Sequence, residues 1–209
     1  MLGPLDEIVD SDEFREAGFA YAVSIRHVEY TTTVELRVDE GDGPPHEPNW
    51  RVTCSDRWKF WVEDDVHDIF VYEVEDPTAL QFTDEQKSLF FSAPPNDVDV
   101  VLVELWEAHS SVSGREIPFA RYFNGEIPIR SLLTGYGQLG TGPAFLLDAY
   151  ARVLRKHGMH PSLLSNGHLA RWENGQHRNA PALLRLACLG GAVLLAASFE
   201  SERIGRAAG

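Results

Sequence analysis

The sequence has only two cysteines among its 209 residues, Cys54 and Cys188, and they lie 134 positions apart. A zinc site built from cysteine ligands needs more of them, so this class of metal site is excluded. By count, one long-range disulfide remains an alternative. We expect two free, buried thiols instead, because free cysteine is among the most buried residue types and disulfides are rare in cytoplasmic proteins.

A long hydrophobic run is also missing. The longest apolar stretch, residues 182–199, is interrupted by Arg185 and by the pair Gly190-Gly191, which makes it a poor membrane span. The first residues show no basic segment followed by an apolar segment, so no signal peptide is expected. These features predict a cytoplasmic protein without a membrane partner.

Catalytic motifs are scarce. The sequence contains no G-x-S-x-G, S-x-x-K, P-loop, H-E-x-x-H or EF-hand pattern. Residues 135–140 match G-x-G-x-x-G, but Pro128 breaks the segment before them, and no acidic residue follows at the distance that a dinucleotide site requires. We therefore expect no catalytic residue, no cofactor and no resident metal, and we lean toward a protein that is not an enzyme.

Negative charge is what the sequence has in excess. It carries 32 acidic and 18 basic residues, a formal net charge of −14. Residues 1–109 hold 26 acidic and 7 basic side chains, a balance of −19, whereas residues 110–209 have a balance of +5. An acidic surface can simply keep a protein soluble, or it can attract a basic partner. It repels phosphates, so nucleic acid is not an expected partner.

The first third of the chain predicts an antiparallel sheet. Residues 6–16 are acidic and weakly helical, and the segments after them are rich in aromatic and β-branched residues. Val34, Leu36 and Val38 alternate with polar residues, which is typical of a half-buried strand. The expected strands cover residues 19–30, 32–38, 50–54, 58–62 and 67–74, with a loop over 39–48.

The rest of the chain predicts two main helices and a hairpin. Apolar residues recur at helical spacing over 97–112, where Asn96 can cap, although the many valines also allow a strand. A second helix is expected over 143–157, beginning at Pro143 and ending before Gly158. Residues 87–92 form a strand unless 83–86 begin a short helix. Residues 125–142 resemble a loop with one helical turn near Ser131, and residues 182–188 and 192–199 flank a Gly-Gly hairpin turn.

These elements together predict an α+β fold. A mostly antiparallel sheet, made of the N-terminal strands and the C-terminal hairpin, is packed by the helices over about 97–112 and 143–157. We expect one globular domain spanning residues 1–209.

One candidate surface lies in the acidic part of the chain. Exposed tryptophans are frequent anchors of protein interfaces, and carboxylates beside them would attract a basic protein. Packing in the core is the alternative for the tryptophans, and a metal site at Asp64, Asp65 and His67 is a lesser alternative for the carboxylates. The candidate partner-binding residues are Trp50, Trp61, Glu63, Asp64, Asp65 and Asp68.

A second candidate surface is a small-ligand pocket in the second half. Polar side chains lie among apolar ones before a glycine-rich segment, and residues 141–143 place backbone N–H groups where a helix begins, which suits an anion. The same residues can instead fix a loop. The candidate ligand-binding residues are His109, Arg121, Tyr122, Asn124, Gly140 and Gly142.

The leading functional hypothesis is a non-enzymatic interaction protein that binds a basic partner protein. The charge profile resembles that of bacterial immunity proteins and of nucleic-acid mimics, although charge alone identifies no family. In its sharpest form the hypothesis is a bacterial immunity or inhibitor protein. The alternative is a small-ligand-binding protein or enzyme that uses the pocket near His109 and Arg121.

Overall fold

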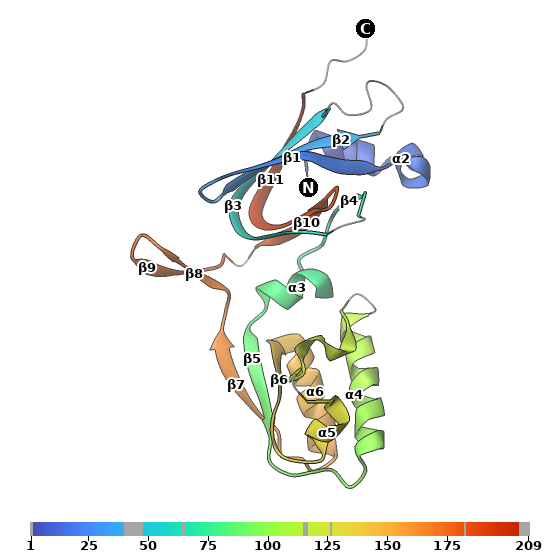
Figure 1. Ribbon diagram of the computed structural model, residues 1–209, viewed down its shortest axis with the longest axis vertical. Coiled ribbons are helices and arrows are strands. Elements are labelled where there is room, and N and C mark those ends of the chain that lie inside the picture. The colour runs from blue at the N-terminus through green and yellow to red at the C-terminus, as the bar shows by residue number, and fades with distance from the viewer. Residues whose placement is uncertain are drawn as a thin grey trace. The chain divides into compact units, whose positions relative to one another are not determined.

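The computed structural model describes residues 2–39, 48–63, 66–114, 117–125, 127–181 and 183–204. The chain divides into two compact units (Figure 1). Unit 1 combines residues 1–74 with 181–209, and unit 2 is the continuous segment 75–180. Every paired strand is antiparallel, which confirms the predicted α+β class. No helix among the described residues is long and apolar enough to cross a membrane.

Unit 1 is built on a six-stranded sheet with the order β1-β2-β3-β11-β10-β4. The inward residues of β2 are Val34, Leu36 and Val38, as their alternation predicted, and all three are fully buried. The strands are β1 (Ala20–Val28), β2 (Thr31–Val38), β3 (Trp50–Val62), β4 (Ile69–Val71), β10 (Arg185–Leu189) and β11 (Ala192–Arg203), and two short helices precede them, α1 (Pro4–Val9) and α2 (Asp12–Ala17).

The sheet curls strongly, so that its two ends approach each other (Figure 1). The Ala20 N–H donates to the His67 carbonyl (2.7 Å), and the Ala22 N–H donates to the Gly190 carbonyl (3.0 Å). The start of β1 therefore meets the segment before β4 and the turn after β10. Leu5 of α1, Leu2 just before it and Phe14 of α2 complete a single core inside this curled sheet.

The C-terminal hairpin is confirmed. Gly190 and Gly191 have φ angles of 57° and 91°, which only glycine adopts freely and which a two-residue type I′ turn requires. Leu189 and Ala192 are paired across this turn. Both strands lie inside the sheet, as their apolar sequences predicted.

The segments 50–54 and 58–62, predicted as two strands, form one strand of 13 residues, β3. Asp56 has a φ of 54°, and the pairing of β3 with β11 shifts register between Leu195 and Ala196. This bulge absorbs one residue without ending the strand. The polar residues Ser55, Asp56 and Arg57 therefore mark an irregularity in a long curved strand and not a turn.

Unit 2 packs its helices on one three-stranded sheet with the order β6-β5-β7. The strands are β5 (Gln86–Phe91), β6 (Gly137–Pro143) and β7 (Ser162–Gly167). The helices are α3 (Pro77–Thr83), α4 (Val98–Ser113), η1 (Phe119–Tyr122), α5 (Ile129–Leu133) and α6 (Ala144–Lys156), and a separate hairpin comprises β8 (Ala170–Glu173) and β9 (Gln176–Asn179).

The two long helices are confirmed, but they pack on the three-stranded sheet of unit 2 and not, as predicted, on the sheet of the N-terminal strands and the C-terminal hairpin. Their ends also differ from the prediction. The cap of α4 is Asp97, whose carboxylate accepts from the Asp99 and Val100 N–H groups, and not Asn96. Pro143 is the residue before α6 and not its first helical residue. The strand predicted over 87–92 is confirmed as β5. The alternative, a short helix beginning within 83–86, is wrong, because the helix α3 lies before this segment and ends at Thr83.

The glycine-rich segment before α6 was predicted as a loop, and this is wrong over residues 137–143. These residues form β6, which pairs with β5 along its whole length. The predicted helical turn near Ser131 is present as α5. A strand with three glycines gives a weak sequence signal because glycine has low strand propensity.

Both cysteines are free and buried, as expected. Burial raises the pKa of Cys54 to about 12 and also raises the pKa of Cys188. Because the thiolate is the reactive form, we expect dithionitrobenzoate at pH 8 to modify the folded protein at least about a hundredfold more slowly than the urea-unfolded chain. Rapid release of one equivalent from folded protein would contradict this arrangement.

Candidate binding groove

Two adjoining hollows in unit 1 form one groove along β4. The first has a volume of about 540 Å³ and the second about 470 Å³. They share three residues, Val9, Asp10 and Ile69, so that the helices and β4 are the two walls. Figure 1 shows α2 and β4 on the same side of unit 1. We call this feature the β4 groove; its other lining residues are Leu2, Asp6, Phe14, Arg15, Gly18, Phe19, His67, Asp68, Phe70, Val71, Tyr72, Glu73, Val74 and Arg185.

The helical wall is fixed by local sequence signals. Pro4 occupies the first turn of α1, and the buried side chains of Leu2 and Leu5 anchor this helix in the core. The Ser201 hydroxyl of β11 donates to the Leu2 carbonyl and accepts from the Leu5 N–H (3.1 Å). Ser11 then caps α2 by accepting from the Phe14 N–H (3.2 Å). The helices are thereby held over the sheet.

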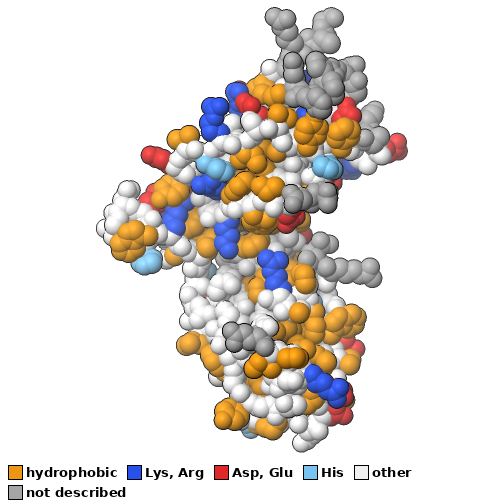
Figure 2. Space-filling model, in the orientation of Figure 1, with side chains coloured by type: hydrophobic (Ala, Val, Ile, Leu, Met, Phe, Trp, Pro, Cys, Tyr) orange, Lys and Arg blue, Asp and Glu red, His pale blue; other side chains and the backbone are white. Residues whose placement is uncertain are grey.

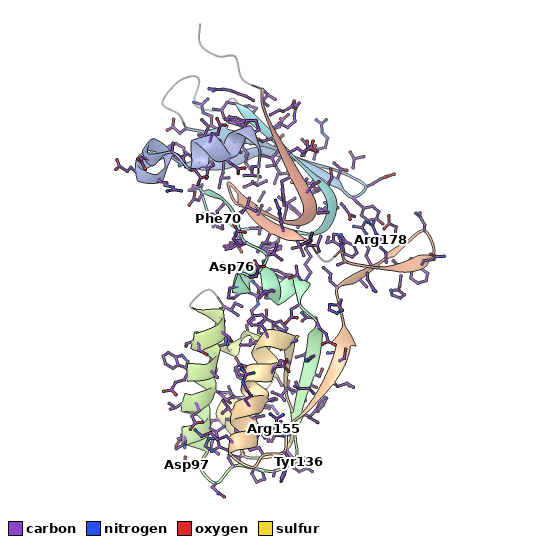
Figure 3. The ribbon with its side chains drawn as sticks, turned by 180° about the vertical axis from the view of Figure 1, so that it is seen from behind. Phe70, Asp76, Asp97, Tyr136, Arg155 and Arg178 are labelled. Carbon is purple, nitrogen blue, oxygen red and sulfur yellow. The ribbon has the colours of Figure 1, made fainter. Side chains whose placement is uncertain are left out.

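The strand wall combines apolar surface with carboxylates. Phe70 and Tyr72 contact each other edge to face on one side of β4, with ring centroids 4.9 Å apart (Phe70 is labelled in Figure 3). Asp68 precedes the strand and accepts from the Ile69 N–H (2.7 Å), and Glu73 follows the strand with an exposed side chain. The wall therefore offers both apolar contact and negative charge.

Negative charge dominates the groove and its unit. Four carboxylates line it, those of Asp6, Asp10, Asp68 and Glu73, against two guanidinium groups. Arg15 pairs with Asp10 at 2.9 Å, but both side chains are largely exposed, so the pair is weak and easily exchanged. Unit 1 as a whole holds 20 acidic and 9 basic residues, a balance of −11, whereas unit 2 has 12 and 9, a balance of −3.

A third hollow, of about 310 Å³, lies on the outer face of the sheet beside Ser24, Glu35 and Arg51. Here the charges are already satisfied: Arg51 donates to Glu35 (3.0 Å) and to Glu202 (2.9 Å). The hydrogen bond from Arg51, and then that from Ser24, lower the pKa of Glu35. These internal pairs leave less charge for a partner than the carboxylates of the β4 groove.

The structure separates the predicted partner-binding residues. Trp50 is only 3% exposed and belongs to the core, so it cannot anchor a partner. Trp61 donates its ring N–H to Glu63 (2.9 Å), and both lie outside the residues that line the groove. Asp68 is the one predicted residue that lines it. Asp64 and Asp65 lie outside the described residues.

His109, the centre of the predicted ligand pocket, is fully engaged inside unit 2. It is 3% exposed; its Nε2 donates to the Ile117 carbonyl (2.6 Å), and its Nδ1 accepts from the Tyr150 hydroxyl (2.7 Å). Burial raises the pKa of Tyr150, so this hydroxyl keeps its proton. Since both ring nitrogens have protein partners, the imidazole ties α4 to α6 and has no free group for a ligand.

The remaining predicted pocket residues also have structural contacts. The Tyr122 hydroxyl donates to Gln81 (3.1 Å), and the exposed guanidinium of Arg121 lies 5.8 Å from the Tyr122 ring centroid. The Asn124 N–H donates to the Leu139 carbonyl of β6 (2.9 Å). A Cβ at Gly140 would overlap the Tyr122 carbonyl, and one at Gly142 would lie 2.8 Å from the Tyr122 ring. The two glycines therefore let η1 pack against β6.

The N-terminus of α6, predicted as an anion site, is occupied by the chain itself. The Asp84 carboxylate accepts from the Phe145 N–H (2.7 Å), and its other oxygen accepts from the Glu85 N–H (2.8 Å). A carboxylate at this position satisfies an open N–H group and interacts favourably with the helix dipole. The site that the sequence suggested for an external anion is a helix cap.

We expect Asp84→Ala to lower the free energy of unfolding by about 1–2 kcal/mol, because it removes both the hydrogen bond and the charge at this helix end. Asp84→Asn should lose only part of this, since an amide oxygen still accepts. Urea denaturation followed by circular dichroism measures both, with the exposed Glu107→Gln as the control. Equal stability of Asp84→Ala and Glu107→Gln would rule out the capping role.

The hairpin of β8 and β9 was not among the predicted elements. Asn174 and Gly175 both have positive φ angles, 50° and 79°, and the Asn-Gly pair is a strong hairpin signal that was available in the sequence. The hairpin carries Trp172, which is 64% exposed and contacts the His177 ring at 5.0 Å. Arg171 and Arg178, both bonded to Glu173, give this hairpin a positive balance, so it does not suit a basic partner.

Among the described residues, no group of three or more histidine, cysteine, aspartate or glutamate side chains is arranged to hold a metal ion. Hydrophobic side chains reach the surface of both units on the face shown in Figure 2. Neither a protein-family model, nor a curated protein, nor a solved structure matches this chain significantly. Among the described residues, the β4 groove is therefore the feature that bears on function.

Proposed function

We propose that this protein is a non-enzymatic interaction protein whose unit 1 binds a basic partner protein in the β4 groove. The observation that carries the proposal is that four carboxylates and exposed apolar surface line the same groove. Its two hollows have volumes of about 540 and 470 Å³. A groove of this kind favours a partner that offers both cationic and apolar side chains.

The charge distribution supports the same partner class. Unit 1 has a balance of −11, so its field attracts a basic protein from beyond contact distance. Such attraction raises the association rate and is screened by salt, with a Debye length of about 8 Å at physiological ionic strength. An immunity or inhibitor protein that blocks a basic toxin or nuclease is the sharpest form of the proposal.

The alternative of a small-ligand enzyme loses its support because its central residue is used elsewhere. Both ring nitrogens of His109 have hydrogen-bond partners, and Tyr122 occupies the space beside the two glycines that were predicted to bind a ligand. A general base needs a nitrogen that can reach a substrate. The described part of unit 2 uses these residues for packing.

The test compares two triple variants with the same net charge. The groove variant is Asp6→Asn, Asp10→Asn and Glu73→Gln, and the control variant is Glu29→Gln, Glu107→Gln and Glu200→Gln, each of which removes three exposed or partly exposed carboxylates. The partner is first captured from a lysate of the source cells at low salt and identified, and its affinity for each variant is then measured.

We expect a basic partner that binds wild-type and control variant alike and binds the groove variant at least about a hundredfold more weakly, since each close charge pair contributes on the order of 1 kcal/mol or more. The loss should shrink at high salt. If the groove and control variants bind the partner equally, the groove is not the binding surface and the proposal fails.

A further inference from the structure

β4 is an edge strand whose outer side is open beyond His67, whose carbonyl accepts from the Ala20 N–H of β1. It pairs with β10 alone. In an antiparallel pair, every second residue directs its N–H and C=O toward the partner strand. Tyr72 donates to the Leu186 carbonyl (2.9 Å) and Asp68 accepts from the Gly190 N–H (2.8 Å), which fixes the phase. The backbone groups of Val71 and Glu73 therefore point away from β10, and no described residue of unit 1 pairs with β4 on that side.

The open side of β4 faces the groove. Every residue from Ile69 to Val74 lines the first hollow, together with Asp6, Val9 and Asp10 of α1 and its C-terminal cap. An added strand would lie about 4.8 Å from β4, a spacing at which its main chain bonds to the Val71 amide and carbonyl. The hollow thus provides the space that a further strand needs.

The two faces of β4 differ in chemistry. Ile69 and Val71 belong to or pack against the core to which α1 contributes, so these side chains share a face with α1. Phe70 and Tyr72 are on the opposite face. Residues directly opposite one another in a sheet share a face. An added strand would therefore place every second side chain near the carboxylates of Asp6 and Asp10 and the others beside the two aromatic rings.

We propose that the β4 groove receives an extended segment of the basic partner, which adds to unit 1 as an antiparallel strand beside β4. The segment alternates basic residues, opposite Val71 and Glu73, with apolar residues beside Phe70 and Tyr72. This inference rests on the proposed function and names how that partner is bound. Main-chain hydrogen bonds supply affinity in such strand addition, and the alternating side chains supply specificity.

A second copy of this chain does not fit the same edge. Pairing of two β4 edges would bring the carboxylates of Asp10 and Glu73 of both copies together, and like charges oppose such pairing. The acidic groove therefore protects the open edge against self-association while it admits a segment of opposite charge.

The test uses synthetic hexapeptides and the full-length protein. The parent probe is acetyl-(Lys-Val)₃-amide with a fluorescent label, and (Glu-Val)₃ is the charge-reversed control. In the proposed antiparallel pairing, residues opposite Val71 direct their own N–H groups toward β4. N-methylation of the lysine amides should therefore weaken binding at least about tenfold, the effect of losing one to two hydrogen bonds, whereas N-methylation of the valine amides should not.

Two measurements on the protein complete the test. Val71→Pro removes an N–H group that points outward, a change that edge strands tolerate, and should weaken the parent peptide at least about tenfold. In the complex, amide exchange should slow at Val71 and Glu73 and stay unchanged at Phe70, whose N–H already faces β10.

Any other ranking of the methylated peptides overturns strand addition. If both bind like the parent while (Glu-Val)₃ does not, charge alone is recognised; strand addition fails and the proposed function stands. If no peptide binds, yet the partner still loses affinity for the groove variant, strand addition fails in the same way. Only equal binding of the partner to the groove and control variants removes the proposed function.

Discussion

Gly140→Ala is expected to destabilise unit 2 by about 3 kcal/mol, because an added methyl group would overlap main-chain atoms and not a movable side chain. The Tyr122 carbonyl and the Phe123 backbone run directly across Gly140, and Phe123 forms a β-bridge with it. The overlap can be relieved only if η1 moves away from β6. That movement would also pull Phe123 away from the Tyr150 ring, on which it stacks at 5.2 Å.

Amide hydrogen exchange at buried positions of α6, such as Leu147 and Leu154, measures the stability of unit 2 within the full chain. Gly125→Ala is the matched control, because nothing lies within 4 Å of its added Cβ, and it should change stability by less than about 0.5 kcal/mol. If Gly140→Ala is as stable as Gly125→Ala, the close approach of η1 to β6 is wrong.

Gly142 offers a second, different test of the same packing. Its added Cβ would meet the Tyr122 ring, which can be removed, so Tyr122→Ala should relieve Gly142→Ala in a double-mutant cycle. The same second substitution should not rescue Gly140→Ala, since the conflict there is with the backbone. Rescue at Gly142 without rescue at Gly140 would show that the first glycine contacts a side chain and the second contacts the main chain.

The sequence predicted the elements whose signal is periodic. Alternation over Val34, Leu36 and Val38 identified β2, helical spacing identified α4 and α6, and the Gly190-Gly191 pair identified the final hairpin. Each of these signals is local, because the residues that produce it are neighbours in the same element.

The glycines of β6 predicted a loop, although the segment is a strand. Gly140 and Gly142 suggest a loop by composition, yet they are small because Tyr122 packs on them. Glycine is required at both positions because residues about 20 positions earlier pack against them. A pattern of neighbouring residues cannot reveal such a contact. The same holds for Asp56, where a single positive φ bends β3 without interrupting it.

The β4 groove could be predicted only in part. Acidic composition and Asp68 pointed to unit 1, but the groove is made by α1, by α2, by β4 and by the start of β10, and the helices are far from the strands in sequence. Trp50 was chosen for its residue type, and its burial follows from its place at the start of β3 over the core. Which carboxylates converge is a property of the curled sheet.

His109→Ala is expected to destabilise unit 2 by about 4 kcal/mol, since it opens a cavity and leaves two buried polar groups without partners. The imidazole joins the Ile117 carbonyl to the Tyr150 hydroxyl, and neither group has access to water where it lies. Tyr150→Phe should lose only about 1–2 kcal/mol, because it removes one hydrogen bond and keeps the ring. Urea denaturation of each variant, with the exposed His168→Ala as control, measures these values.

The double variant separates a structural histidine from a functional one. If His109 serves to satisfy Tyr150, the combination of His109→Ala with Tyr150→Phe should lose less stability than the two single losses added together, because the second change removes the group that the first left unsatisfied. A histidine held for ligand binding would give additive losses and near-wild-type stability in His109→Ala. Such a result would return the ligand pocket of unit 2 to consideration, whereas strong coupling would assign His109 to the packing of unit 2 and leave the β4 groove as the proposed binding surface.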